Sequence, residues 1–353
     1  FLLYVSVVSY CYICTMICQK FAILFLFALF TISAACSDES TVPPPAPDSS
    51  VNIIKSGNEE PVSPDLNGPS IYLMGKGMPA LSSYEYFLNT FVDSPVDIIV
   101  LAGSPASGGS ATPECDLLME LDMVNSCVTA TVQSEAESNS ADLVEIIDHS
   151  EAIYFAGGNQ CVYVNWRDSN LHHAINQLIE RGGGIGGGSA GLAIQGDMIY
   201  DGCSGSVRSE EALTDPYHEY ISISEGLFEL SSLNHTITDS HFSERDRLGR
   251  LISFMARISI EKDRDEYFGL GLDDNTSVVI GPNGIGEVFG GYATVLRATE
   301  KAQLAKEGDP VTIYGVERIV SAPGETVNMN EFSSERADLI DVEKGEVIFR
   351  NEE

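Results

Sequence analysis

The stretch Gly184-Ile-Gly-Gly-Gly-Ser-Ala-Gly191 decides the fold of this chain. Gly187 and Gly191 flank Ser189 with the spacing G-x-S-x-G, and Leu192-Ala-Ile follows as the start of a helix. A serine at such a strand-to-helix junction exposes its hydroxyl on a sharp turn. The N-terminus of the following helix offers amide donors to a developing negative charge. The stretch therefore predicts a nucleophile elbow at Ser189; the alternative is a glycine-rich turn or a phosphate loop, here without the lysine of a P-loop.

Short apolar runs alternate with helical stretches along the chain around this elbow. Strands are expected at 71–74, 96–101, 127–132, 152–155 and 184–186, and helices at 83–92, 114–122, 140–148 and 172–181. This alternation predicts an α/β fold in which helices flank a mostly parallel sheet. Ligands bind at the carboxyl ends of the strands in such sheets, so we expect the glycine-containing loops there to form the site.

Two further segments place polar residues at the ends of predicted strands. One strand ends in Asp239-Ser240-His241, and the helix behind it has apolar residues at 248, 251, 252, 255 and 258. A second buried strand, 269–272, ends in Asp273 and Asp274. The histidine follows the serine in the chain, as in other α/β sheets that carry an elbow. These segments predict a base and a carboxylate to act with Ser189.

The motifs together resemble those of the cyanophycinase and aspartyl dipeptidase family of serine peptidases, and the cyanophycinase branch more closely. The resemblance covers residues 70–290. It implies a class I glutamine amidotransferase-like fold, which is a three-layer sandwich with a nucleophile elbow. The motifs that carry it are Gly157-Gly-Asn-Gln160, Gly188-Ser189-Ala190-Gly191, Asp239-Ser240-His241-Phe242 with arginines at 245, 247 and 250, and Leu272-Asp273-Asp274.

The resemblance implies a catalytic role for three of these side chains. Ser189 attacks the scissile carbonyl, and His241 accepts its proton and returns it to the leaving amine. Asp274 orients the histidine, with Asp273 as the alternative, because the family has the longer Glu at this position. Backbone N–H groups of Gly158 and Ala190 form the oxyanion hole. Substrate-binding roles fall to Gln160, Asp239, Ser240, Arg245, Arg247 and Arg250.

The substrate expected from the resemblance is cyanophycin, a polyaspartate that carries arginine on its side chains, with β-Asp-Arg dipeptide as the product. Three arginines fall within six residues of a chain with only 19 Lys and Arg, and guanidinium groups bind carboxylates in bidentate pairs. The alternative for these arginines is a solvated helix face. Ser240 stands where the family has Gln, which leaves another Asp-containing peptide as an alternative substrate.

The composition limits other functions. The chain has 52 acidic and 19 basic residues, a formal charge of −33, which disfavours nucleic acid and anionic membrane surfaces as partners. We expect no cofactor and no metal site, since no Cys or His spacing suggests one. A catalytically silent surface-binding lipoprotein is an alternative function. An amidotransferase would need a cysteine at position 189, where this chain has serine. The sequence leaves open whether two copies associate as a homodimer.

The first 36 residues have the pattern of a signal peptide. Residues 21–32 are an apolar run of 12, too short to span a bilayer, preceded by Lys20 and followed by Ser33-Ala34-Ala35. Cys36 then fits the acylated cysteine of a lipoprotein, so we expect an exported protein, periplasmic or at the cell surface, held by a lipid anchor. Met16 is the expected start, with residues 1–15 upstream of it.

The rest of the chain divides into three expected parts. Residues 37–68, rich in Pro and Ser, form a linker; residues 69–293 form the catalytic domain; residues 294–353 add edge strands to that domain. Four cysteines follow Cys36, and export permits them to form disulfides. Three pairings are possible and the spacing favours none.

Overall fold

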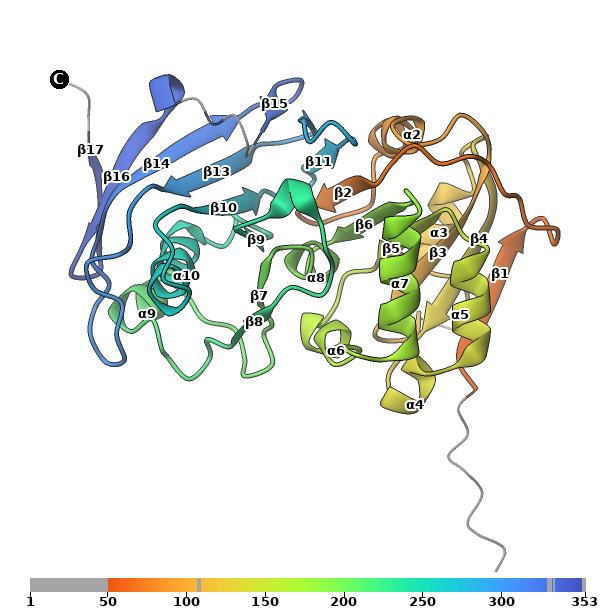
Figure 1. Ribbon diagram of the computed structural model, residues 1–353, viewed down its shortest axis with the longest axis horizontal. Helices are drawn as coiled ribbons and strands as arrows, with labels where there is room; N and C mark the ends of the chain where they lie inside the picture. The colour runs from red at the N-terminus through yellow and green to blue at the C-terminus, as the bar shows by residue number, and fades with distance from the viewer. Residues whose placement is uncertain (1–49, 107–108, 329–331, 333, 351–353) are drawn as a thin grey trace, which may run out of the picture. The chain divides into compact units, whose positions relative to one another are not determined.

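The structure, a computed structural model, describes residues 50–106, 109–328, 332 and 334–350, which belong to one compact unit (Figure 1). The expected signal peptide, Met16, Cys36 and residues 37–49 of the linker lie outside the described residues. Within the described ranges, no helix has both the length and the apolar character needed to cross a bilayer.

The first sheet contains the parallel core that the sequence predicts. Its strand order within the described residues is β1-β4-β3-β5-β6-β2-β11-β12-β15. The five strands from β4 to β2 are mutually parallel, and β2, β3, β5 and β6 are buried along their whole length, as in sheets covered on both faces. The parallel strands are β2 (Ser70–Met74), β3 (Val96–Ala102), β4 (Val124–Thr131), β5 (Ala152–Phe155) and β6 (Gly184–Gly188).

Helices pack on both faces of this sheet. Tyr72 and Tyr154 point to one face, where they pack with side chains of α2 (Leu81–Asn89) and α3 (Pro113–Leu118). Alternate residues such as Leu73 point to the other face, against α5 (Ala141–Asp148) and α7 (Asn170–Glu180). The fold class, a mostly parallel sheet flanked by helices with a turn at Ser189, is confirmed (Figure 1).

A second sheet carries the C-terminal part of the chain. Its order within the described residues is β17-β16-β14-β13-β10-β9-β7-β8, and its centre is the parallel pair β9 (Thr236–Asp239) and β10 (Tyr267–Leu272), joined by α10 (Leu248–Glu261). β7 (Met198–Tyr200) also runs parallel to β9, while β8 (Ile223–Glu225) pairs antiparallel to β7. The other members are β13 (Ala293–Ala298), β14 (Ile313–Ser321), β16 (Asp338–Glu343) and β17 (Glu346–Arg350).

The second sheet differs from the expected role of residues 294–353. These residues lie in the same compact unit, but most of their strands extend a separate antiparallel sheet instead of edging the first one. β14 and β16 each combine buried and solvent-accessible positions, because one face of an antiparallel sheet can remain in water. At the edge of the first sheet lie β11 (Ser277–Ile280), β12 (Gly286–Phe289) and β15 (Thr326–Val327).

The expected linker contains a strand. β1 (Asn52–Gly57) pairs antiparallel with β4, from Asn52 opposite Thr131 to Gly57 opposite Ser126. Only two of its six residues, Ile53 and Ile54, are large and apolar, and it lies at the edge of the sheet, where strands need no continuous apolar run. The folded unit therefore starts before residue 69, the boundary expected from composition.

Two disulfides resolve the pairing that the sequence left open. Cys115 of α3 is bonded to Cys127 of β4, and Cys161 of α6 (Gln160–Val164) is bonded to Cys203 in the loop after β7. The first is buried in the core beside the first sheet, whereas the second lies at the surface.

Candidate active site

The turn at Ser189 joins β6 to α8 (Ala190–Ala193). Ser189 has φ 52° and ψ −104°, a conformation that non-glycine residues rarely adopt. A Cβ atom on Gly187 would lie 2.7 Å from the carbonyl carbon of Gly191, and one on Gly191 would lie 2.3 Å from the carbonyl oxygen of Phe155. Only glycine fits at these two positions, which explains the G-x-S-x-G spacing around the serine.

His241 comes from the second sheet and meets Ser189 across the gap between the two strand ends. It follows β9 with φ 48°, and its ring is buried. The Ser189 Oγ atom lies 2.9 Å from His241 Nε2, so the hydroxyl can donate its proton to the ring. This is the contact that a serine nucleophile needs with its base.

Asp274 lies on the other side of the imidazole. Its Oδ1 atom is 2.8 Å from His241 Nδ1, although the N–H direction departs from that of a linear hydrogen bond. Both atoms are buried, and among the described residues neither has another hydrogen-bond partner. The second carboxylate oxygen, Oδ2, lies 3.1 Å from Lys76 Nζ, and the Asp274 N–H donates to Glu244 Oε1 at 3.0 Å.

Asp273, the alternative acid, faces elsewhere. Its Oδ1 atom accepts a hydrogen bond from Ser243 N at 3.0 Å, and the residue lines a separate hollow of about 400 Å³ with Tyr292 and Arg318. Neighbouring residues at a strand end project in opposite directions, so only one of the two carboxylates can reach the ring. The structure brings Asp274 to His241.

The surroundings of His241 favour its neutral form. Burial is the main cause that lowers the pKa of His241, and the positive charge of Arg245 lowers it further, while Asp274 acts in the opposite direction. The net effect is a pKa below the ordinary value of 6.5. A neutral imidazole is the form that can accept a proton from the Ser189 hydroxyl.

The two expected oxyanion donors lie beside Ser189. Gly158 has φ 145° and lies on an exposed turn; a Cβ on its neighbour Gly157 would be 3.8 Å from the Ser189 Cβ. Ala190 is the first residue of α8, whose first N–H groups have no partner within the helix. Among the described residues, no acceptor is hydrogen-bonded to either N–H group, so both remain available to a ligand.

These residues open onto a cleft of about 270 Å³. The segments 158–160, 202–206 and 239–241 supply much of its wall, with Tyr200 and the three arginines completing it. The cleft contains nine of the eleven predicted catalytic, oxyanion and substrate-binding residues: Gly158, Gln160, Ser189, Asp239, Ser240, His241, Arg245, Arg247 and Arg250. Ala190 and Asp274 adjoin it through Ser189 and His241.

The three arginines do not act as one group. Arg250 binds Asp239 through two hydrogen bonds, Nε to Oδ2 at 2.7 Å and Nη2 to Oδ1 at 2.6 Å. Arg247 adds a third bond to Asp239 Oδ1 at 3.1 Å and donates to the Ser240 carbonyl at 2.7 Å. All these side chains are buried. The carboxylate predicted to contact substrate is therefore occupied by two of the arginines predicted to bind substrate.

Arg245 is different, since it is exposed and forms no ion pair within the described part of the chain. Burial lowers the pKa of Arg247 to about 10, with Asp239 acting against that shift. Of the three arginines, Arg245 is the one whose guanidinium is free to meet a carboxylate in the cleft.

Some residues of the site escaped the sequence analysis. Lys76 lies in the loop after β2, whose glycines had marked it as part of the site, but nothing indicated its contact with Asp274. Tyr200 donates to the carbonyls of Gly205 and Tyr220 at 2.9 and 3.0 Å, and Arg250 lies over its ring at 5.1 Å. No local pattern identifies this tyrosine, because all its partners are distant or in an irregular loop.

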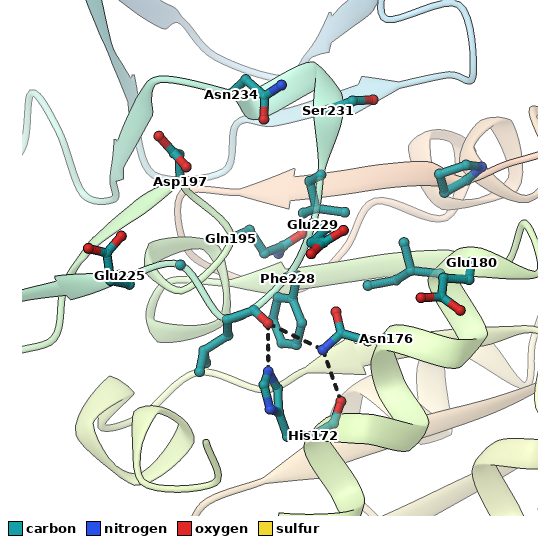
Figure 2. Close-up of a pocket in the computed structure, with 15 residues that line it drawn as sticks. His172, Asn176, Glu180, Gln195, Asp197, Glu225, Phe228, Glu229, Ser231 and Asn234 are labelled. Atoms are coloured by element: carbon teal, nitrogen blue, oxygen red, sulfur yellow. Dashed lines mark hydrogen bonds between the residues drawn. The ribbon is translucent and has the colours of Figure 1, made fainter. Parts of the chain in front are cut away.

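A wider hollow of about 800 Å³ lies between α7 and the 226–234 segment, away from Ser189 and His241 (Figure 2). At its floor, the Leu227 carbonyl contacts His172 Nε2 at 2.6 Å and accepts from Asn176 Nδ2 at 3.3 Å. Its walls carry several acidic side chains, but Asp197 and Glu225 are paired with Arg264 and Lys262. The predicted catalytic residues Ser189 and His241 therefore line the smaller cleft and not this larger hollow.

Known proteins are similar to this chain over the region that holds the cleft. The model of peptidase family S51 matches residues 117–286, which include Ser189, His241 and Asp274. A cyanophycinase of Geminocystis herdmanii (strain PCC 6308) is 27% identical over 205 residues, 56% of this chain and 69% of the relative. A cyanophycinase of Nostoc sp. (strain PCC 7120) is 26% identical over 209 residues, 56% of this chain and 63% of the relative, so the chain matches less than two thirds of that protein.

Among solved structures, a peptidase from an acI-B1 Actinobacterium covers 75% of this chain and 98% of its own, at 16% identity and a TM-score of 0.46. The family match and the curated relatives lead to one assignment. The chain is similar to peptidase family S51 over residues 117–286 and is a serine-type peptidase.

Proposed function

We propose that this protein is an exported, cyanophycinase-like exopeptidase that uses Ser189, His241 and Asp274 as its catalytic triad. The observation that carries the proposal is the continuous chain of contacts, 2.9 Å from Ser189 Oγ to His241 Nε2 and 2.8 Å from His241 Nδ1 to Asp274 Oδ1. The glycine-lined turn, which fixes Ser189 at the end of β6, supports the same roles.

The proposed reaction proceeds in two halves. Ser189 Oγ attacks the scissile carbonyl while its proton moves to His241 Nε2, and the N–H groups of Gly158 and Ala190 stabilise the oxyanion. The C–N bond then breaks, His241 protonates the leaving amine, and an acyl-serine remains. Water, deprotonated by His241, hydrolyses the ester and restores the serine proton. Asp274 holds the ring with Nε2 toward Ser189 and stabilises the imidazolium.

The proposed substrate is cyanophycin, cleaved at its aspartyl backbone to release β-Asp-Arg. Both named relatives are cyanophycinases, and the cleft offers the exposed guanidinium of Arg245 to a substrate carboxylate. Arg247 and Arg250 support the site differently, by fixing Asp239 and the Ser240 backbone at the cleft wall.

One observation favours a second substrate class, other Asp-containing peptides. Ser240 is short, is buried at the cleft wall, and stands where relatives of the cyanophycinase branch are expected to have Gln. With two arginines already bound to Asp239, the cleft has fewer free groups to distinguish a polyaspartate from a single aspartyl residue. Ser240→Gln is expected to raise the rate on cyanophycin relative to the rate on α-Asp dipeptides.

The experiment that tests the function is incubation of the purified full chain with cyanophycin and, separately, with α-Asp dipeptides, followed by mass spectrometry of the products. Release of β-Asp-Arg supports the first substrate, and cleavage of α-Asp dipeptides alone supports the second. Ser189→Ala is the control and should lower either rate by about 10⁴-fold or more. An unchanged rate in Ser189→Ala would exclude Ser189 as the nucleophile and leave open a silent binding lipoprotein with a contaminating activity.

Export and lipid attachment at Cys36 belong to the same proposal. Both disulfides support export, because structural disulfides persist in oxidising compartments and are rare in the cytosol. The mass of the N-terminal peptide from cells expressing the full chain tests it. A diacylglyceryl-modified Cys36 is expected, and Cys36→Ala should move the protein from the membrane fraction to the soluble fraction.

A further inference from the structure

The Cys161–Cys203 disulfide joins two neighbouring segments that both line the cleft. Residues 158–160 immediately precede Cys161, and Gly202, Gly205 and Ser206 surround Cys203. All of these residues line the cleft, while neither cysteine does so itself. The covalent bond thus lies directly behind two parts of the cleft wall.

The first segment carries a proposed oxyanion donor on an exposed turn. Gly157, Gly158 and Asn159 are all exposed to solvent, and Gly158 has φ 145°. Asn159 Oδ1 accepts a hydrogen bond from Cys161 N at 3.1 Å, which ties the turn to the start of α6. The turn lies between the buried strand β5 and α6, and a Cβ on Gly158 would meet nothing within 4 Å, so the position of the turn is set by the two elements that flank it.

The second segment is also exposed, and the Gly205 carbonyl, which accepts a hydrogen bond from the Tyr200 hydroxyl at 2.9 Å, ties it to the end of β7. Residues 203–206 are solvent-exposed, and Cys203 N donates to Asp201 Oδ1 at 2.9 Å. Across to the first segment, Gln160 Nε2 donates to the Tyr200 carbonyl at 3.3 Å, a long and weak hydrogen bond. Gly202 packs against the same side chain, since a Cβ there would lie 2.9 Å from Gln160 Nε2.

We infer that the Cys161–Cys203 disulfide is a positioning element of the active site, which holds the Gly158 turn and the 202–206 loop at the separation that catalysis requires. The inference rests on the proposed function. Two electrons and two protons from a dithiol convert the disulfide into two thiols and free the segments from each other. The oxyanion hole then loses its fixed donor at Gly158, and peptidase activity falls under reducing conditions.

The other disulfide provides a matched control. Cys115 and Cys127 are completely buried and join α3 to β4, and neither cysteine nor an adjacent residue lines the cleft. Removing either bond is expected to lower the melting temperature, because each cross-link restricts the unfolded chain. Only loss of Cys161–Cys203 should change catalysis as well.

The first experiment compares the full-length variants C161S/C203S and C115S/C127S with the wild type. C161S/C203S should lower kcat on the cleaved peptide by tenfold or more, the scale of an impaired oxyanion donor, and slow labelling of Ser189 by a fluorophosphonate to a similar degree. C115S/C127S should keep both rates within about twofold of the wild type at 25 °C. Wild-type kcat and labelling rates in C161S/C203S, or equal losses in both variants, would overturn the inference.

Selective reduction supplies a second test that needs no mutant to fold. Cys203 is exposed and Cys161 half-buried, so dithiothreitol should reduce this bond before the buried one. Alkylation and peptide mass spectrometry identify the thiols formed. Activity and Ser189 labelling should fall together with alkylation of Cys161 and Cys203 and return on reoxidation. Full activity after complete alkylation of these two cysteines would contradict the proposal.

The fluorophosphonate readout separates the two proposals. Wild-type protein that is labelled at Ser189 but cleaves no Asp-containing peptide disproves the substrate assignment, and the labelling rates still test the disulfide. A wild type that is not labelled at all disproves the serine nucleophile, and the role of the disulfide falls with it.

Discussion

Two carboxylates near the ends of neighbouring strands, Asp239 at the end of β9 and Asp274 two residues after β10, have opposite surroundings. β9 and β10 are parallel, and Gly271 lies opposite Asp239, so the two strands end at the same edge of the second sheet. Asp239 is buried and bound by two arginines, whereas Asp274 is 20% exposed and lies between His241 and Lys76. The same kind of side chain is thus bound by arginines at the end of one strand and contacts the histidine ring just beyond the end of the other.

This difference shows that the role of each carboxylate is set by the groups that contact it, and not by its position at a strand end. Asp239 neutralises two buried guanidinium groups, which would otherwise be costly to desolvate. Asp274 contacts one ring that changes charge during the reaction and one lysine in solvent. Replacing each carboxylate should therefore affect different measurements, activity for Asp274 and stability for Asp239.

The largest effect is expected from Asp274→Asn. The amide cannot stabilise an imidazolium and can donate to Nδ1, which favours the wrong tautomer of His241, so kcat should fall by about 10⁴-fold. The melting temperature should remain close to that of the wild type. Steady-state kinetics and calorimetry check both parts. Asp273→Asn, the neighbouring carboxylate bound to Ser243 N, is the control and should stay within a few-fold of wild-type activity.

Asp239→Asn should act mainly on folding. The amide leaves two buried arginines without a counter-charge, and the free energy of unfolding should fall by about 3–5 kcal/mol. Urea denaturation measures it. Asp338→Asn is a control with the same 2.6 Å ion-pair distance, here to Arg318, but Asp338 is 61% exposed, so its loss should cost less than about 1 kcal/mol. Equal losses of unfolding free energy in Asp239→Asn and Asp338→Asn would refute the contrast between the buried carboxylate and the exposed ion pair.

The pH dependence of kcat/KM tests the surroundings of His241, the ring that Asp274 contacts. Burial and Arg245 hold the pKa of His241 below 6.5, so the neutral base persists at pH 6.5 and kcat/KM should decline only at lower pH. Arg245→Ala removes one cause of the lowered pKa of His241. The decline of kcat/KM at acid pH should therefore begin at a higher pH in this variant, whereas in Arg245→Lys it should begin near the wild-type pH. If kcat/KM declines at the same acid pH in Arg245→Ala as in the wild type, Arg245 does not act on the pKa of His241.

The sequence was sufficient for the elements that depend on local pattern. The glycine spacing around Ser189 predicted the elbow because backbone crowding there excludes side chains, and the apolar runs predicted the parallel strands of the first sheet. The chain order of Ser189 and His241 indicated their association. The glycine spacing and the apolar runs depend on residues close together in the chain.

The parts that the sequence could not supply depend on partners far apart or on small rotations. Asp273 and Asp274 follow the same strand, and only the direction of each side chain decides which meets His241. Arg247 and Arg250 look equivalent to Arg245 in sequence, yet Arg247 just before α10 and Arg250 in its first turn both bind the buried Asp239. β1 was missed because an edge strand with polar residues resembles a linker. The second sheet was missed because residues 294–353 lack the regular alternation of βα units.

The smallest effect is expected from Lys76→Ala, which removes the solvent-side partner of Asp274. Lys76 Nζ lies 3.1 Å from Oδ2, but the lysine is 54% exposed, and such pairs contribute about 0–1 kcal/mol. We therefore expect kcat/KM to fall by less than about fivefold, with recovery in Lys76→Arg. Raising the salt concentration should bring the wild type toward the variant, because ions screen an exposed pair. A hundredfold loss would mean that Lys76 positions Asp274. The proposed catalytic carboxylate would then depend on a cationic partner, as Asp239 depends on its two arginines.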